Sequence, residues 1–210
     1  MTILKRADEF GVEEILHFTT NKGVLGILDA RALKARARLN VDERLEYIFQ
    51  PNAANRDKDA AWLDYVNLSV SRINNQFFGA SGNWHRDKNL WWCVLSFDPA
   101  ILGHAGVHFT TTNNIYTGVR RGQGEEAFVN MFAPRVIRWT NNYADRSAAT
   151  LPSHTTCVQA EVLYPGQVST EFLKRIYVLD EQSADELAAQ FHVLRHPEVP
   201  IEICPRIFSQ

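Results

Sequence analysis

The sequence is most decisive at Leu90-Trp-Trp-Cys-Val-Leu-Ser-Phe97, a nearly continuous apolar run that ends at Asp98-Pro99. A short run of this kind, rich in aromatic residues, is typical of a strand that is buried on both faces. Further strands are predicted at Ile15–Thr19, Tyr65–Val70, Val107–Thr111, Cys157–Tyr164, Arg175–Leu179 and Val199–Ile203. Helices are predicted at Asn21–Ala30, Glu125–Phe132 and Ser183–Phe191. Many short strands with few helices between them indicate an α+β fold rather than a doubly wound sheet.

Three polar segments interrupt this pattern. Residues 42–60 are predicted to be loop with a helical turn, residues 74–89 to be a long loop, and residues 138–153 to be irregular. Loops longer than about 12 residues in a compact domain are usually functional or disordered. These segments are therefore candidates for substrate contacts.

Length and composition fit one domain over residues 1–210. A chain of 210 residues, 45% of them apolar, buries roughly 70% of its unfolded surface. It has no run of 18 apolar residues for a membrane span, and Met1–Gly11 lacks the apolar segment of a signal peptide. The three cysteines have no paired spacing, which favours a reducing cytoplasm. We expect a cytoplasmic monomer with no membrane attachment.

The charge pattern limits how the chain binds nucleic acid. The net charge of −2 excludes binding by overall attraction but not by a local basic groove. Arg31, Lys34, Arg36 and Arg38 lie close together without an acidic neighbour. They form either a solvated face or a surface that follows phosphates.

Several common catalytic motifs are absent. The segment Gly122-Gln-Gly124 lacks the third glycine of a dinucleotide fingerprint and follows two arginines rather than a strand. The chain also contains no P-loop and no GxSxG motif. No carboxylate motif accompanies the histidine pairs His104/His108 and His192/His196, so no metal site is expected.

Three polar or aromatic residues stand out by their setting. Glu161 lies in the strand Val158-Gln-Ala-Glu-Val-Leu163, where glutamate is disfavoured and costly to bury unpaired. It is either a salt-bridged structural residue or a catalytic carboxylate in a cleft. His17, inside an apolar strand, is either a core histidine or a ligand contact. Trp84, beside His85-Arg86, is either structural or stacks on a base.

Together these features resemble the DarT family of bacterial DNA ADP-ribosyltransferase toxins. The matching segments are Leu16-His-Phe-Thr19 with Gly26-Ile-Leu28, Asn55-Arg56, Asp64-Tyr-Val66, Val107-His-Phe-Thr-Thr-Thr-Asn113, and Gln159-Ala-Glu-Val-Leu163 with the later strand Lys174-Arg-Ile-Tyr-Val178. They occur in the order and spacing of the family over nearly the whole chain.

The resemblance implies an ADP-ribosyltransferase fold, with two packed, mostly antiparallel sheets and NAD in a central cleft. It also implies transfer of ADP-ribose from NAD to a base in single-stranded DNA, without a metal, and an antitoxin that removes ADP-ribose from DNA. The implied catalytic residues are Glu161 and Arg56. The implied NAD contacts are Leu16, His17, Phe18, Thr19, Leu33 and, in place of the family's turn arginine, Arg72.

The sequence departs from the thymine-modifying branch after Tyr65-Val66. It continues as Asn67-Leu-Ser-Val-Ser-Arg-Ile-Asn74, where that branch has an aromatic strand and a proline-flanked turn. This departure favours the guanine-modifying branch, with thymine as the second choice. The expected DNA contacts are Asn67, Asn74, Asn75, Trp84 and Arg86.

Two other functions fit the same residues. One is an ADP-ribosyltransferase that acts on protein or RNA, because the early His-x-Thr strand is shared more widely than DNA modification. The other is a non-catalytic nucleic-acid-binding module, which would leave Glu161 without a purpose. Labelled NAD incubated with single-stranded oligonucleotides discriminates between these functions.

Overall fold

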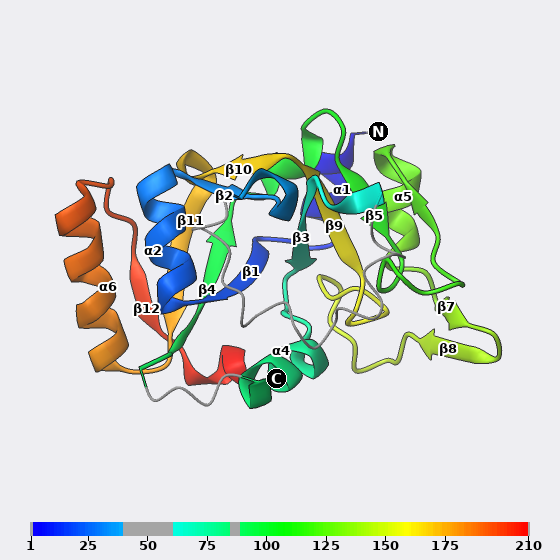
Figure 1. Cartoon of the computed structure of the whole chain (residues 1–210). Coiled ribbons are helices and arrows are strands. Elements are labelled where there is room, and N and C mark those ends of the chain that lie inside the picture. The colour runs from blue at the N-terminus through cyan, green and yellow to red at the C-terminus, as the bar shows by residue number, and fades with distance from the viewer. Residues whose placement is uncertain (1, 40–60, 85–88, 210) are drawn as a thin grey trace.

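A mixed eight-stranded sheet crosses the molecule and carries helices on its faces (Figure 1). The computed structural model describes residues 2–39, 61–84 and 89–209. The sheet has the strand order β12-β11-β4-β1-β3-β9-β5-β6. Its strands are β1 (Ile15–Thr20), β3 (Tyr65–Val70), β4 (Trp92–Phe97), β5 (His108–Thr110), β6 (Arg121–Gly122), β9 (Glu161–Pro165), β11 (Leu173–Val178) and β12 (Ile201–Ile203).

The two sheets expected from the sequence are joined at one short pairing. Strands β1 and β3 pair only at Ile15–Val70 and Leu16–Ser69, whereas β1 pairs with β4 along its whole length. Beyond Leu16 the two strands separate (Figure 1). His17 therefore lies where the two halves of the sheet part.

The position of the central strand β4 between two cores explains why its sequence is almost wholly apolar. Cys93, Leu95 and Phe97 pack into the larger core, whereas Val94 packs into a second cluster on the opposite face with Leu16. All these side chains are fully buried. A strand buried on both faces has no polar side to alternate with.

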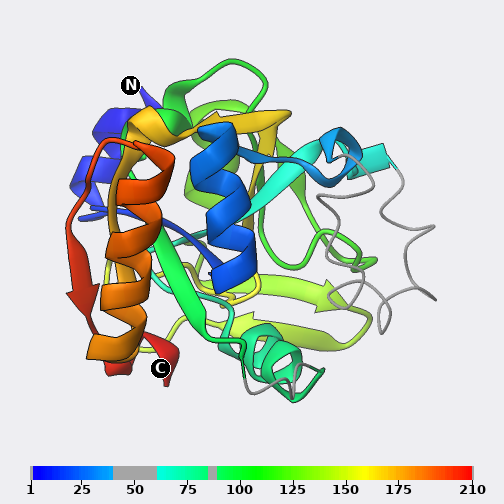
Figure 2. The ribbon, with the colours of Figure 1, turned by 60° about the vertical axis from the view of Figure 1, so that its left-hand side comes forward.

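Helices α2 (Asn21–Ala30) and α6 (Glu181–Leu194) lie side by side over one face of the sheet (Figures 1 and 2). Thr20 accepts a hydrogen bond from the Gly23 amide and caps α2, and Asp180 caps α6 in the same way through Ser183. At the other end of the sheet, helix α1 (Ile3–Glu9) lies near α5 (Gly124–Asn130), and Phe10, which follows α1, packs against Phe128 of α5. The side-chain caps at Thr20 and Asp180 satisfy backbone amides at the start of α2 and α6.

The predicted loop over 74–89 is wrong in its first part, which forms helix α4 (Asn75–Trp84). Gly79 and Gly82 lower helix propensity, but Phe78 packs against Phe18 and Trp92 at ring distances of 5.3 and 5.4 Å. Tertiary packing thus overrides local propensity. The predicted loop over 42–60 lies outside the described residues.

The prediction that residues 138–153 are irregular is also wrong in part. It contributes to a hairpin of β7 (Arg135–Trp139) and β8 (Asn142–Asp145). The turn places Asn141 in the left-handed region, with φ 58°, a conformation that asparagine tolerates and tight hairpins require.

The remaining elements are short. Strands β2 (Ala32–Lys34) and β10 (Gln167–Ser169) form a separate antiparallel pair. The 3₁₀ helices with both ends in the described residues are Arg36–Arg38, Pro99–Gly103, Thr170–Phe172 and Pro205–Phe208. Within residues 2–39, 61–84 and 89–209, each helix is too short or too polar to span a bilayer.

Candidate active site

Glu161 is the first residue of β9 and is held there by the neighbouring strand. Its backbone amide donates a 3.0 Å hydrogen bond to the hydroxyl of Thr110 on β5. That hydroxyl donates onward to the Thr112 carbonyl at 2.8 Å. Since Thr110 is fully buried, these bonds fix the backbone from which the Glu161 carboxylate projects.

Both oxygens of the Glu161 carboxylate accept a hydrogen bond from a fixed donor. Oε1 accepts from Asn67 Nδ2 at 3.0 Å, and Oε2 accepts from the Asn114 backbone amide at 2.8 Å. The carboxylate is therefore oriented before any substrate binds, as electrostatic catalysis requires.

Asn67 connects Glu161 to His17. Its side chain bonds Glu161, and its backbone carbonyl lies 3.0 Å from His17 Nδ1. A carbonyl only accepts, so Nδ1 carries the proton and Nε2 of the neutral ring is an acceptor. Burial lowers the pKa of His17, although the bond to the Asn67 carbonyl opposes that shift. The neutral imidazole is thus the dominant form at neutral pH.

An arginine network fixes the donor on the other side of Glu161. The Arg121 guanidinium donates from Nη2 to the Asn114 carbonyl at 2.8 Å and from Nε to the Asn114 side-chain oxygen. It also lies over the Trp62 ring, 5.6 Å from the centroid. Asn114 is buried, so its amide is held in place by Arg121.

Arg72 lies two residues after β3 and belongs to a group of positive side chains. Its Nη2 donates to the Thr155 carbonyl at 2.8 Å, while its buried Nε has no hydrogen-bond partner within the described part of the chain. Burial lowers the pKa of Arg72, and the charge of Arg146 lowers it further. Burial, Arg72 and Arg146 together lower the pKa of His154. This cluster repels further cations and suits an anion.

The predicted NAD contacts on β1 and β2 divide into half-buried and buried side chains. His17 and Phe18 are half-buried, and Phe18 packs against Phe77 and Phe78 of α4. By contrast, the side chains of Leu16, Thr19 and Leu33 are buried. Leu16 supports the position of His17 from within the core.

The predicted DNA contacts are divided between helix α4, its N-terminus and residues outside the described ranges. Asn74 caps α4 by accepting from the Phe77 amide at 3.2 Å. Asn75 Oδ1 is buried and has no hydrogen-bond partner among the residues described. Gln76 on the same helix meets Gln159, which lies just before β9. Outside the described residues lie Arg56, Arg86 and the side chain of Trp84.

The other clusters considered from the sequence have local partners. Arg38 of the early basic segment forms an ion pair with Asp64 at 2.6 Å. His104 bonds the Tyr164 hydroxyl, His108 bonds the Gly106 carbonyl, and His196 bonds Thr170. No group of three or more His, Cys, Asp or Glu side chains suited to a metal occurs in the described ranges.

A comparison with protein families identifies this arrangement. The model of a family described as "ssDNA thymidine ADP-ribosyltransferase, DarT" matches residues 16–209. The chain belongs to the DarT family. Membership confirms the predicted family and enzyme class, an NAD-dependent transferase of ADP-ribose to single-stranded DNA. A comparison with curated protein sequences found no match.

Solved DarT structures share the fold. Thermus sp. 2.9 DarT in complex with ADP-ribosylated ssDNA has a TM-score of 0.70 at 15% identity, over 94% of this chain and 97% of that one. Its complex with NAD⁺ has a TM-score of 0.64 at 16% identity, over 93% and 97%. Thermosipho africanus DarTG in complex with ADP-ribose has a TM-score of 0.62 at 12% identity, over 93% of this chain and 51% of that one. The predicted α+β fold is confirmed.

Sequence reasoning missed the residues that hold Glu161 in place. Asn67 is predicted as a DNA contact, whereas in the structure its side chain donates a hydrogen bond to the Glu161 carboxylate. Thr110, Asn114 and Arg121 are not predicted at all. The only signal for Thr110 and Asn114 is the polar run Thr110-Thr-Thr-Asn-Asn114 after an apolar segment, and Arg121 lies outside that run.

Proposed function

We propose that this chain transfers ADP-ribose from NAD to guanine in single-stranded DNA and releases nicotinamide. The observation that carries the proposal is the connection of Glu161 to His17 through Asn67. Each of these residues then has a distinct chemical role in the reaction.

Glu161 stabilises the charge that develops on the sugar. When the bond between the ribose C1′ and the nicotinamide nitrogen breaks, its electron pair leaves with nicotinamide and C1′ becomes an oxocarbenium ion. A fixed carboxylate stabilises such a cation most strongly where water is excluded. Glu161 then accepts the proton that the attacking base nitrogen loses.

His17 holds NAD rather than exchanging protons. Its Nε2 is an acceptor because Nδ1 is committed to the Asn67 carbonyl. An acceptor at this position fits a ribose hydroxyl or the carboxamide N–H of nicotinamide. The lowered pKa of His17 keeps that acceptor available.

Arg72 is proposed to contact a phosphate of NAD. The support is its buried, unbonded Nε and the neighbouring positive charge of Arg146. Guanidinium groups bind phosphate oxygens with directed hydrogen bonds. Arg56 remains the proposed catalytic arginine, and it lies outside the described residues.

The proposed choice of guanine rests on the orientation of Asn67. Because the Glu161 carboxylate only accepts, Asn67 must point its Nδ2 toward Glu161, which leaves Oδ1 as an acceptor beside the carboxylate. Guanine has two adjacent donors, the ring N1–H and the 2-amino group, that match two adjacent acceptors. Thymine, which the family description names, has a single ring N–H between two carbonyls and is the second candidate.

The base must leave its stack to reach Glu161, so single strands are the favoured substrate. The direct test is labelled NAD incubated with single-stranded and duplex oligonucleotides that contain all four bases. Label is expected on the single strands. Transfer to protein or RNA instead of DNA would refute the proposal.

We further propose that the chain is a monomeric cytoplasmic toxin whose effect is reversed by an antitoxin that removes ADP-ribose from DNA. In support, about half of the Thermosipho DarTG chain lies outside the match, and that protein is in complex with ADP-ribose. Co-expression with such a hydrolase is expected to restore growth of a host that this chain inhibits.

A further inference from the structure

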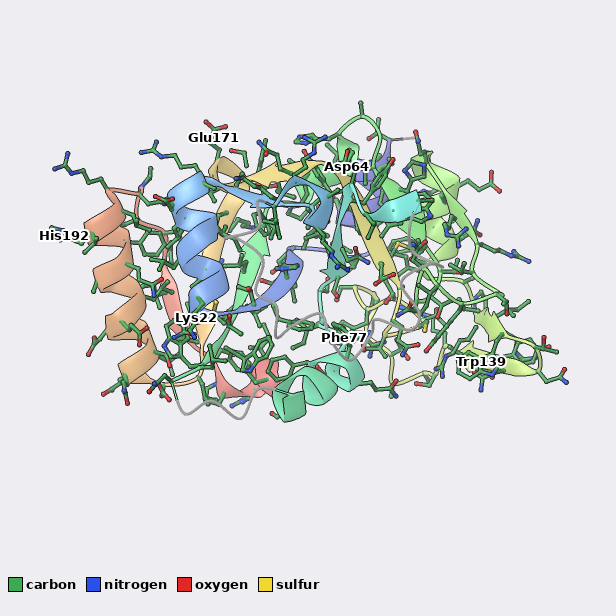
Figure 3. All side chains as sticks on the ribbon, in the orientation of Figure 1. Lys22, Asp64, Phe77, Trp139, Glu171 and His192 are labelled. Carbon is green, nitrogen blue, oxygen red and sulfur yellow. The ribbon has the colours of Figure 1, made fainter. Side chains whose placement is uncertain are left out.

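The hairpin of β7 and β8 has an exposed face of apolar and aromatic side chains. Ile137, Trp139 and Tyr143 are 40, 40 and 46% exposed. Trp139 and Tyr143 are the only tryptophan and tyrosine among the large exposed hydrophobic residues of the described ranges. Figure 3 shows Trp139 at the edge of the molecule. Clustered exposed apolar groups mark an interaction surface.

This face is held rigidly. On the inner side, Val136 and Ala144 pack against the buried Cys157. On the outer side, Ile137 lies opposite Tyr143, and the Arg135 guanidinium stands 5.4 Å from the centroid of the Tyr143 ring. The rings are therefore presented to solvent on an ordered strand pair.

A short loop connects this face to Glu161. At one end, the Asn114 amide donates to the Glu161 carboxylate. At the other end, the Gly118 amide donates to the Arg138 carbonyl of β7 at 3.0 Å. A side chain at Gly118 would lie 2.7 Å from Ile137 Cγ2, so only glycine allows this approach. The loop is thus fixed at both ends.

Tyr116 lies in the middle of this loop and contacts the hairpin. Its ring meets Trp139 edge to face at 4.9 Å. Tyr116 is two residues from Asn114, a span of at most about 7 Å. A stacked strand covers that span in about two nucleotides at ~3.4 Å each. Tyr116 and Trp139 therefore lie within reach of nucleotides next to a base held at Glu161.

The charge of the hairpin region matches a nucleic acid. Residues 134–154 contain Arg135, Arg138 and Arg146 but only one acidic residue, Asp145. Arg138 forms no ion pair within the described part of the chain, and its buried Nε has no hydrogen-bond partner there. Aromatic rings interleaved with arginines are typical of single-stranded nucleic acid binding. Arg135 is paired with Asp145 and Arg146 donates to carbonyls of its own loop, so an apolar protein partner would leave Arg138 without a counterpart.

We propose that Tyr116, Trp139 and Tyr143 form a stacking surface for the bases that flank the modified nucleotide, with Arg138 toward the phosphates. This inference rests on the proposed function, because it assumes that the strand enters at Glu161. It identifies the hairpin as a determinant of strand length and sequence context, separate from the residues that act on NAD.

The test compares Trp139→Ala and Tyr143→Ala with Trp139→Phe, which keeps a ring, and with Val193→Ala, which truncates an exposed side chain on α6. Binding of a labelled twelve-nucleotide single strand is measured without NAD by fluorescence anisotropy. Modification of that strand is compared with modification of a trinucleotide centred on the target base. Calorimetric NAD affinity shows that each variant is folded.

Trp139→Ala and Tyr143→Ala are each expected to weaken binding of the long strand by about 5- to 150-fold, the effect of losing one stacked base. Trp139→Phe and Val193→Ala are expected to stay within threefold of the wild type, and trinucleotide modification is expected to change little. Unchanged binding of the long strand, or equal losses on both substrates, would overturn the inference. If Trp139→Ala weakens DNA binding but the wild type transfers no ADP-ribose, the proposed function fails and the stacking surface stands.

Discussion

Asn67 Nδ2 lies 3.0 Å from Glu161 Oε1, and the same residue accepts from His17 through its backbone carbonyl. One residue of β3 thereby sets the orientation of a carboxylate on β9 and the tautomer of an imidazole on β1. Because β1 and β3 separate just beyond Leu16, the bond between His17 and Asn67 bridges the two halves of the sheet.

The first prediction concerns Glu161. Glu161→Gln keeps the size of the side chain but removes its charge, and is expected to lower the rate of transfer by about 10²–10³-fold, as loss of transition-state electrostatics does. Thermal unfolding should change little, because Glu161 is only half-buried. Expression of the active chain should harm a bacterial host, and expression of Glu161→Gln should not. Activity within threefold of the wild type would return Glu161 to a structural role.

Asn67→Asp tests the bridge to Glu161. The substitution replaces a donor with a second carboxylate, and two like charges in contact repel. Transfer is expected to fall by about tenfold or more at pH 8 and to recover as the pH is lowered, because a protonated carboxyl donates as the amide does. The pH–rate profile of transfer measures this, with Asn130→Asp at the end of α5 as the control. Parallel profiles for Asn67→Asp and the wild type would contradict the assignment.

His17→Ala is expected to weaken NAD binding by about 1–3 kcal/mol, the cost of leaving a buried partner unpaired. The measurement is calorimetric titration with NAD in the absence of DNA. His192→Ala, at a histidine near the end of α6, is the matched control. An unchanged NAD affinity would make His17 a core residue only.

The same histidine predicts a pH dependence of stability. Burial lowers the pKa of His17, so the unfolded chain binds a proton at a higher pH than the folded chain does. The contribution of His17 to the free energy of unfolding therefore decreases as the pH falls below about 6.5, the ordinary pKa of histidine. Chemical denaturation between pH 7.5 and 5 should show a shallower loss for His17→Gln than for the wild type.

The parts of the fold that can be predicted from the sequence are those with two buried faces. Strand β4 is recognisable because Cys93 to Phe97 pack into cores on both sides. Helix α4 is not, since Gly79 and Gly82 oppose it and the packing of Phe78 compensates. The β7–β8 hairpin buries only Val136 and Ala144 of its side chains, which leaves too weak an alternation to recognise.

The candidate site likewise contains residues that the sequence predicts and a contact that it does not. Glu161 and His17 stand out because each is a titratable residue inside an apolar strand. The bond between Asn67 and Glu161 depends on the register of β3 against β9, in which Asn67 lies opposite Leu163. A shift of one residue would turn Asn67 to the other face, and no local pattern specifies that register.

The last prediction is that guanine is the acceptor. With Nδ2 committed to Glu161, the Asn67 side chain places an acceptor beside the carboxylate, and these two acceptors match the N1–H and 2-amino donors of guanine. A dT tract with a single dG should therefore be labelled by radioactive NAD, whereas the uninterrupted dT tract should not. A tract with inosine in place of dG lacks the 2-amino group and should lose labelling if that amine is the nucleophile. The duplex form should react poorly, because flipping a paired base costs a few kcal/mol. Mass spectrometry of the released nucleosides identifies the modified base. Labelling of the dT tract at a rate equal to that of the dG-containing strand would make thymine the acceptor and leave the transfer of ADP-ribose to DNA intact.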